Sequence, residues 1–151
     1  MRRVVTGLNA AGKSCILFDG PVPRHGPAAN LIWRNAVPAD NSGEADMAVP
    51  YDMAHLHDGQ VNFIVTELPP MDANGGLPGG AFLHATDTID YLVMIAGEVV
   101  LVLESGEVTL RAGDFIVDRG VIHGWRNDGA VPAVFASVTI PAVPVGPGRT
   151  V

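Results

Sequence analysis

Hydrophobic and polar residues alternate along most of this chain in short runs that end at turn residues. Val61–Leu68 shows the pattern well, and it ends at Pro69 and Pro70. Alternation with a period of two predicts β-strands that have one buried face. Many short strands joined by turns are typical of an all-β sandwich or barrel. The predicted strands are Arg3–Thr6, Ser14–Phe18, Leu31–Trp33, Val61–Leu68, Ala81–Thr86, Tyr91–Ala96, Val99–Glu104, Glu107–Leu110, Phe115–Asp118, Gly124–Asn127 and Ala133–Ile140.

The same pattern predicts one domain with three parts. Residues 1–60 hold two N-terminal strands and a long arm, rich in Pro, Gly, Asn and Asp, that is expected to pack on the barrel. Residues 61–140 form the barrel core, and residues 141–151 an extended, weakly ordered tail. Within the core, the glycine-rich stretch 72–80 predicts a flexible loop that can approach a ligand or close over it.

Composition supports an ordered, acidic globular protein. Of 151 residues, 48% are hydrophobic and 17% charged, and the net charge is −7. The acidic balance argues against nucleic acid or an anionic membrane as a partner, since both need a basic face. No run reaches the roughly 18 apolar residues of a membrane span, and polar residues interrupt any apolar signal-peptide stretch near the start. We therefore expect a cytoplasmic protein, with the single Cys15 as a small strand residue.

Two neighbouring strands are apolar on both faces. Tyr91–Ile95 and Val99–Leu103 lack the alternation of a strand with one solvated face. Their outer face should therefore be covered. A second copy of the chain, helped by the N-terminal strands, is the simplest cover and predicts a homodimer.

Two stretches carry candidate chemistry at defined spacing. The first reads His84-X-Thr86-(X)3-Asp90-(X)6-Gly97, and the second ends Gly120-(X)2-His123-(X)3-Asn127. Together they resemble the two motifs of the cupin family, G(X)5HXH(X)3-4E(X)6G and G(X)5PXG(X)2H(X)3N. Pro78 stands where the first motif opens with Gly, and Asp118 stands in the Pro position of the second. The variant motif also resembles a subgroup of small single-domain cupins.

The resemblance implies a cupin jelly roll with its site inside the barrel. Cupins of the full motif bind a metal through three His and one Glu. This chain keeps His84 and His123, shortens Glu to Asp90, and has Thr86 in place of the middle His. Two His and one carboxylate suit a divalent Fe, Zn, Mn or Ni ion, whereas a hydroxyl is a poor ligand. His84, Asp90 and His123 are therefore candidate metal ligands, with a metal-free site as the alternative.

A metal-free site also has coherent chemistry. Residues i and i+2 of a strand share a face, so His84 and Thr86 should point into the barrel, as should His123 and Trp125. Asp90 with either His could remove a proton next to a carbonyl, while Thr86 or the other His stabilises the oxyanion. We expect His84, Thr86, Asp90 and His123 to catalyse an isomerase, dehydratase or lyase reaction on a small carbonyl or aromatic, polyketide-like substrate.

Further candidates surround this set. Trp125, Arg119 and Tyr91 are candidate substrate contacts. Asp118 and Arg119 could instead form an ion pair or a turn, and Tyr91 could instead lie in the core or at an interface. His55-X-His57 has the literal spacing of two metal ligands but lacks the rest of the motif, so solvated loop histidines are expected.

Other functions remain open. An Fe-dependent dioxygenase and a non-catalytic small-molecule-binding cupin are the main alternatives, and a purely structural dimer module is a third.

Overall fold

The computed structural model describes residues 1–26, 28–71 and 81–151. Ten strands and one 3-10 helix make up this part of the chain. They are β1 (Arg2–Leu8), β2 (Ser14–Pro21), β3 (Ala29–Asn35), η1 (Met53–Leu56), β4 (Val61–Leu68), β5 (Thr88–Ala96), β6 (Glu98–Leu103), β7 (Gly106–Arg111), β8 (Phe115–Asp118), β9 (His123–Arg126) and β10 (Ala133–Pro141).

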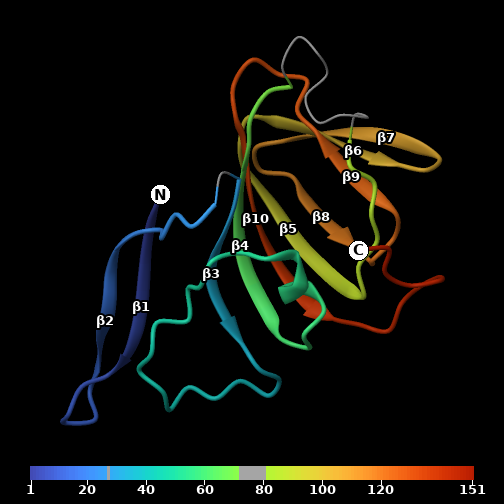
Figure 1. Cartoon of the computed structure of the whole chain (residues 1–151). Coiled ribbons are helices and arrows are strands. Elements are labelled where there is room, and N and C mark those ends of the chain that lie inside the picture. Colours follow the sequence, from blue (N-terminus) through green and yellow to red (C-terminus); the bar gives the residue numbers. More distant parts are fainter. Residues whose placement is uncertain (27, 72–80) are drawn as a thin grey trace.

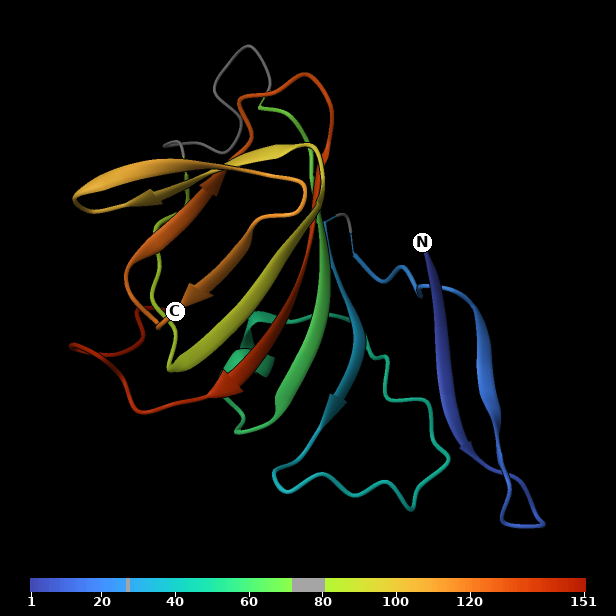
Figure 2. The same cartoon turned by 180° about the vertical axis from the view of Figure 1, so that it is seen from behind.

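Two antiparallel sheets form the barrel. One has the order β3-β4-β10-β5-β8 and the other β7-β6-β9. The two sheets face each other and curve around a shared interior (Figures 1 and 2). The predicted all-β jelly roll is thus confirmed. Neighbours in the sheet are distant in sequence, as β4 and β10 are, because the chain crosses between the sheets rather than running as simple hairpins.

The apolar core lies between the sheets at one end of the barrel. Its members come from β5, β6, β7 and β10 and project from alternate positions, as the strand period requires. They are Leu92, Met94, Val99, Leu101, Leu110, Ala133 and Phe135. The core thus closes one end of the barrel, and polar residues occupy the inner face beyond it.

The arm between β2 and β4 is more regular than predicted. The short strand expected at Leu31–Trp33 is the centre of β3, which pairs with β4 as the edge of the larger sheet. The arm then forms η1, whose Leu56 packs with Leu31 and Ile64 in a second apolar cluster. Asn62, fully buried on β4, donates from Nδ2 to the carbonyl of His55, at a distance of 2.9 Å. This bond ties η1 to the barrel wall.

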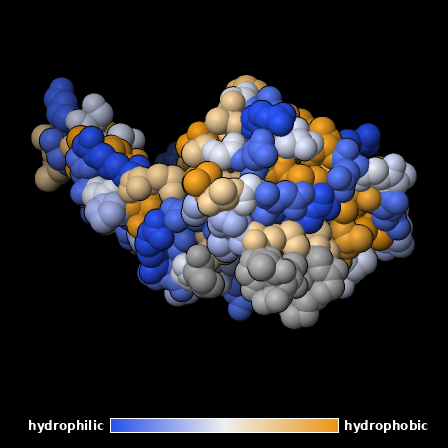
Figure 3. Space-filling view, turned by 90° about the horizontal axis from the view of Figure 1, so that it is seen from above, coloured by the Kyte–Doolittle hydropathy of each residue, from blue (hydrophilic) through white to orange (hydrophobic). Residues whose placement is uncertain are grey.

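The N-terminal hairpin β1–β2 stands apart from the barrel, as Figures 1, 2 and 3 show. Arg3 joins the two parts. Its guanidinium is 8% exposed, pairs with Asp46 of the arm and donates to the carbonyl of Ile32 on β3. A buried guanidinium needs several partners to offset its desolvation. Arg3 therefore helps to position the hairpin, together with Arg24, which follows β2 and pairs with Glu67 of β4.

The segment 81–87 differs from the prediction. No regular strand forms at Ala81–Thr86; instead, His84 makes an isolated antiparallel bridge with His123. The segment is held close to the second motif because glycine there leaves room for it. A Cβ on Gly124 would lie 2.8 Å from the carbonyl oxygen of Phe82. Close approach of an irregular backbone to the start of β9 therefore replaces strand pairing.

The tail 142–151 contains no helix or strand, and it is bonded to the barrel near its end. The amide of Thr150 donates to the carbonyl of Ala85, and the amide of Ala85 donates to Oγ1 of Thr150, at 3.0 and 2.9 Å. The tail thus lies against the segment that carries His84. The glycine-rich loop predicted at 72–80 lies outside the described residues, and among those described no helix is long and apolar enough to cross a membrane.

Gly120 should be the least replaceable glycine of the second motif. Its φ is +70°, and a Cβ there would lie 2.4 Å from the carbonyl oxygen of Thr86. Gly12 has φ +69° and no atom lies within 4 Å of such a Cβ, so a substitution at Gly12 measures the cost of backbone strain without a steric clash. We expect Gly12→Ala to lower the free energy of unfolding by about 1–2 kcal/mol, and Gly120→Ala by about 2–5 kcal/mol because overpacking adds to the strain.

Urea titration of the two variants measures the difference. Equal losses at the two positions would show that segment 81–87 does not press against Gly120.

Candidate functional site

A cavity of about 180 Å³ lies inside the barrel between the two sheets. Strands β4, β5, β9 and β10 supply most of its wall, and β3, the arm, η1 and the segment 81–87 supply the rest. Its lining residues are Ala29, Tyr51, Met53, Leu56, Ile64, Thr66, His84, Thr86, Asp90, Leu92, His123, Trp125, Phe135, Ser137 and Thr139. The five predicted interior residues of the two motifs, His84, Thr86, Asp90, His123 and Trp125, therefore meet in one cavity.

Five rings form a continuous row, and four of them, all but the exposed Phe82, line this cavity. The ring centroids are 5.3 Å apart from Phe82 to His84, 4.6 Å from His84 to His123, 5.7 Å from His123 to Trp125 and 5.0 Å from Trp125 to Phe135. The contact of His123 with Trp125 is edge to face, and the others are stacked or tilted. Such a wall suits a flat, partly apolar molecule.

His123 is paired with a buried carboxylate. Its Nδ1 lies 2.7 Å from Oδ2 of Asp118 and 2.9 Å from the carbonyl oxygen of Val121, and both ionisable side chains are about 5% exposed or less. Burial works against the charge of His123, but the hydrogen bond and charge of Asp118 outweigh it and raise the pKa of His123 above its ordinary 6.5. The pair therefore favours an imidazolium with Nδ1 engaged and Nε2 as its remaining donor.

The ionised form of Asp118 is stabilised by its neighbours. Burial raises its pKa, but His123 and the backbone amides of Gly120 and Val121 reverse that effect, and the net pKa is below 3.8. Oδ1 accepts from the amide of Gly120 at 3.0 Å. The sequence left Asp118 as an ion pair or turn residue; its place before Gly120, where the cupin motif has Pro, was the available signal.

Asp90 is the opposite kind of carboxyl group. Burial raises its pKa to about 6, although a hydrogen bond with Thr88 works the other way. Oδ1 is buried and has no hydrogen-bond partner among the described residues. Oγ1 of Thr88 lies 2.7 Å from Oγ1 of Thr86, which holds these two hydroxyls in place. A carboxyl group with a free buried oxygen and a pKa near neutrality can take or give a proton.

Tyr51 adds a phenol that the sequence did not indicate. It reaches the cavity from the arm, where no periodic pattern marks inward positions. Burial, followed by the nearby charge of Asp90, raises its pKa to about 12, so it stays a neutral hydrogen-bond donor.

His84 differs from His123 in charge. Burial lowers its pKa below 6.5, against the smaller opposing effect of the Phe82 carbonyl. Its Nδ1 lies 3.1 Å from that carbonyl oxygen, which can only accept, so Nδ1 carries the proton and Nε2 the lone pair. The two imidazoles therefore have opposite roles available, one as a neutral acceptor and one as a cationic donor.

Two predicted substrate contacts lie elsewhere. Tyr91 is 48% exposed on the outer face of β5, and Arg119 is exposed at the end of β8; neither lines the barrel cavity. Residues i and i+1 of a strand face opposite ways, so the inward position of Asp90 directs Tyr91 outward.

The arm histidines also correct an expectation. His55 is not a simple solvated residue, since its Nδ1 accepts from the amide of Asp52 in the cap of η1. His57 buries both of its ring nitrogens.

The predicted metal ligands do not fit a metal ion as they are placed. Within the described residues, no group of three or more His, Cys, Asp or Glu side chains has the arrangement of a metal site. Asp118 favours the protonated form of His123, and a metal ion would have to displace that proton from Nε2. Thr86, in the place of the middle His, is committed to Thr88. The side chains alone therefore carry the chemistry that this arrangement supports.

Comparison with known proteins places the fold and the two motifs in one family. Residues 72–139 match the family model described as "Cupin domain". This chain belongs to the cupin family.

This chain is similar to several known proteins over most of its length. "Phomopsin biosynthesis cluster protein C'" of Diaporthe leptostromiformis is 52% identical over 136 residues, which cover 83% of this chain and 69% of the relative. "Cupin-domain-containing oxidoreductase virC" of Hypocrea virens is 27% identical over 95% of this chain and 77% of the relative. Among solved structures, an uncharacterized protein with a double-stranded β-helix domain from Klebsiella pneumoniae is 26% identical, with a TM-score of 0.45, over 54% of this chain and 68% of that one.

Removing the charge of Asp118 should change the titration of His123. In Asp118→Asn the hydrogen bond loses its charge and burial dominates, so the pKa of His123 should fall below its wild-type value. NMR titration of the imidazole Hε1 resonance measures it. Asp114→Asn, a substitution in the turn before β8, is the control and should leave the pKa unchanged; an unaltered pKa in Asp118→Asn would contradict the pairing.

Asp90 should destabilise the folded protein at neutral pH. A folded-state pKa of about 6 against an ordinary 3.8 means that the penalty for ionising Asp90 grows as the pH rises from about 3.8 to 6. Asp90→Asn removes that penalty. The stability advantage of the variant over wild type should therefore be about 2 kcal/mol larger at pH 7.5 than at pH 4.5.

Urea unfolding at the two pH values measures this gain. A stability difference between variant and wild type that does not change with pH would show that the pKa of Asp90 is not raised.

Proposed function

We propose that this cupin is an enzyme of secondary-metabolite biosynthesis that transfers protons on a small carbonyl compound bound in the barrel, as an isomerase, dehydratase or lyase. The observation that carries the proposal is the free buried oxygen of Asp90 in the same cavity as two imidazoles, of which His84 favours the neutral form and His123 the cationic form. The biosynthetic setting is supported by the names of relatives such as "Phomopsin biosynthesis cluster protein D", 52% identical over 141 residues.

In the proposed reaction, Asp90 is the base. Its carboxylate takes the proton from the carbon next to the carbonyl, and the electron pair of that C–H bond forms a C=C bond. The carbonyl oxygen takes up the displaced π electrons and receives the proton of His123 Nε2. Asp118 stabilises the imidazolium before that transfer. Return of a proton to a different carbon gives isomerisation, and loss of a β-substituent gives elimination.

The remaining lining supplies binding. The rings of His84, His123, Trp125 and Phe135 form a wall for an aromatic or polyketide-like body. Tyr51 stays a neutral phenol in the same lining, and its hydroxyl would exchange its bond to Sδ of Met53 for one to a substrate oxygen. A cavity of about 180 Å³ is smaller than the roughly 300–1,000 Å³ of common ligand pockets, so it admits a small molecule or one end of a larger one.

A second candidate is an oxidoreductase. Three relatives that are 27–28% identical carry the name "Cupin-domain-containing oxidoreductase", among them fogC of Aspergillus ruber and srdD of Neurospora crassa. A form of this activity that uses Fe or another divalent metal, as a dioxygenase would, requires His84, Asp90 and His123 to move out of the described arrangement.

A homodimer belongs to the same proposal. Tyr91, Phe115 and Val117 leave an apolar face open on β5 and β8, with Phe115 81% exposed. A non-catalytic ligand-binding role is the remaining alternative, and it predicts binding without turnover.

Deuterium exchange tests proton transfer without knowledge of the natural substrate. The protein is incubated in D2O with a panel of small aromatic ketones and 1,3-dicarbonyl compounds, and loss of the α-proton signal is followed by NMR. We expect exchange that rises as Asp90 ionises near pH 6 and falls as His123 loses its proton above 6.5.

Asp90→Asn should reduce this exchange by at least about 100-fold, the usual contribution of a general base. Tyr91→Phe, on the outer face, is the control and should exchange as wild type does. Deuterium exchange in Asp90→Asn at the wild-type rate would show that Asp90 is not the base. Turnover that needs oxygen and stops with a chelator would support the oxidoreductase instead.

A further inference from the structure

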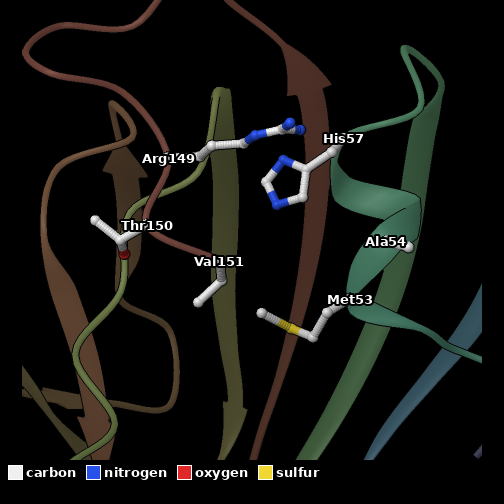
Figure 4. Close-up of a pocket in the computed structure, with 6 residues that line it drawn as sticks. All are labelled: Met53, Ala54, His57, Arg149, Thr150 and Val151. Atoms are coloured by element: carbon white, nitrogen blue, oxygen red, sulfur yellow. The ribbon is translucent and has the colours of Figure 1, made fainter.

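A second hollow, of about 610 Å³, lies outside the barrel cavity. Its lining residues are Met53, Ala54, His57, Arg149, Thr150 and Val151, which Figure 4 shows. Met53 also lines the barrel cavity, so the two spaces share a wall. The outer hollow is therefore placed to hold a part of a substrate that the smaller inner cavity cannot.

His57 is an unsatisfied polar group in the wall of this hollow. Both of its ring nitrogens are buried and have no hydrogen-bond partner among the described residues. Figure 4 shows the ring turned from the end of η1 toward the side chain of Arg149. An imidazole without partners loses its hydration and gains nothing in return. A ligand that hydrogen-bonds to it would remove that penalty.

Arg149 enters the hollow from the opposite side on a fixed backbone. Its amide donates to Oδ1 of Asp87 at 2.8 Å, and the next residue, Thr150, bonds to Ala85 in both directions. The guanidinium extends toward His57 in Figure 4. The backbone bonds thus present a cation at a defined place.

Most arginines of the chain are already paired. Each of six forms an ion pair with a carboxylate: Arg2, Arg3, Arg24, Arg34, Arg111 and Arg126. Arg149 has no side-chain hydrogen bond or ion pair within the described part of the chain, and it faces the one imidazole there with both nitrogens buried and unpartnered.

We propose that His57 and Arg149 form a carboxylate-binding subsite, which holds the acid group of the substrate while its body passes Met53 into the barrel cavity. The proposal rests on the proposed function, because it names the class of substrate that the same site takes. A guanidinium offers two parallel N–H donors that match the two oxygens of a carboxylate. An imidazole N–H adds a third donor.

The charge of the site favours a carboxylate over a phosphate. Among the described residues, Arg149 is the only Lys or Arg that lines the hollow, so a dianion would remain partly uncompensated. The net charge of −7 adds to its repulsion. The side chains of Met53, Ala54 and Val151 in the same lining are apolar and suit the carbon chain next to the acid group.

Calorimetric titration with unreactive acids tests the subsite. The probes are phenylpropionate, phenylbutyrate and phenylpentanoate, each with its neutral primary amide as the comparison. We expect at least one acid to bind wild type more tightly than its amide, and the difference to shrink as salt is added. Arg149→Gln should weaken acid binding by about tenfold or more, and His57→Gln by less.

Arg119→Gln is the matched control, since it removes the same charge from an exposed position outside the hollow. It should leave the affinity unchanged, and all variants should keep the wild-type melting temperature. The proposal is overturned if no acid is preferred over its amide, or if Arg149→Gln binds the acids as wild type does. Loss of affinity in Arg119→Gln alone would place the anion elsewhere.

This outcome is independent of the proposed chemistry. Asp90→Asn should still bind the acids with the same dependence on Arg149. Acid binding without any deuterium exchange would support the subsite and contradict the proposed reaction. Deuterium exchange on neutral ketones without a preference for acids would support the reaction and contradict the subsite.

Discussion

The proposed chemistry depends on the buried contact of Asp118 with His123. It fixes one imidazole in position and favours its charged form, with Nε2 directed away from the carboxylate. Asp90 lies directly opposite Asp118 on the neighbouring strand β5, but its Oδ1 lacks such a partner and its pKa is raised to about 6. Two carboxyl groups of the same type are thereby set to different tasks by burial and hydrogen bonding. Such a separation is what an acid and a base at one site require.

The geometry of this contact depends on backbone that is not in regular strands. Segment 81–87 lies between the second motif and the tail, bonded to His123 on one side and to Thr150 on the other. Gly120 and Gly124 leave the space that this segment fills. Some residues of the family motif thus serve packing, and others line the cavity. Asn127 illustrates this, since its side chain is 1% exposed and bonds only to backbone at Leu68, Val131 and Gly129.

The sequence predicted the sheets and the motif residues well because both depend on spacing. Alternation located β4 and β8 at their observed bounds, and motif spacing brought His84 and His123 to one cavity. Prediction failed where position depends on loops. Tyr51, His57 and Arg149 lie on segments without a period, and only the folded arm and tail bring them to the site. Whether these residues bind or react stays a prediction, since neither spacing nor geometry measures turnover.

The row of rings has a further consequence for observing the protein. Trp125 meets the edge of His123 at a centroid distance of 5.7 Å, so the indole senses the charge of that imidazole directly. A protonated imidazole quenches indole emission more strongly than a neutral one. Trp33, on β3, is the other tryptophan and does not line the cavity. The fluorescence of the barrel tryptophan therefore gives an intrinsic optical signal of proton occupancy at the site, with no attached label.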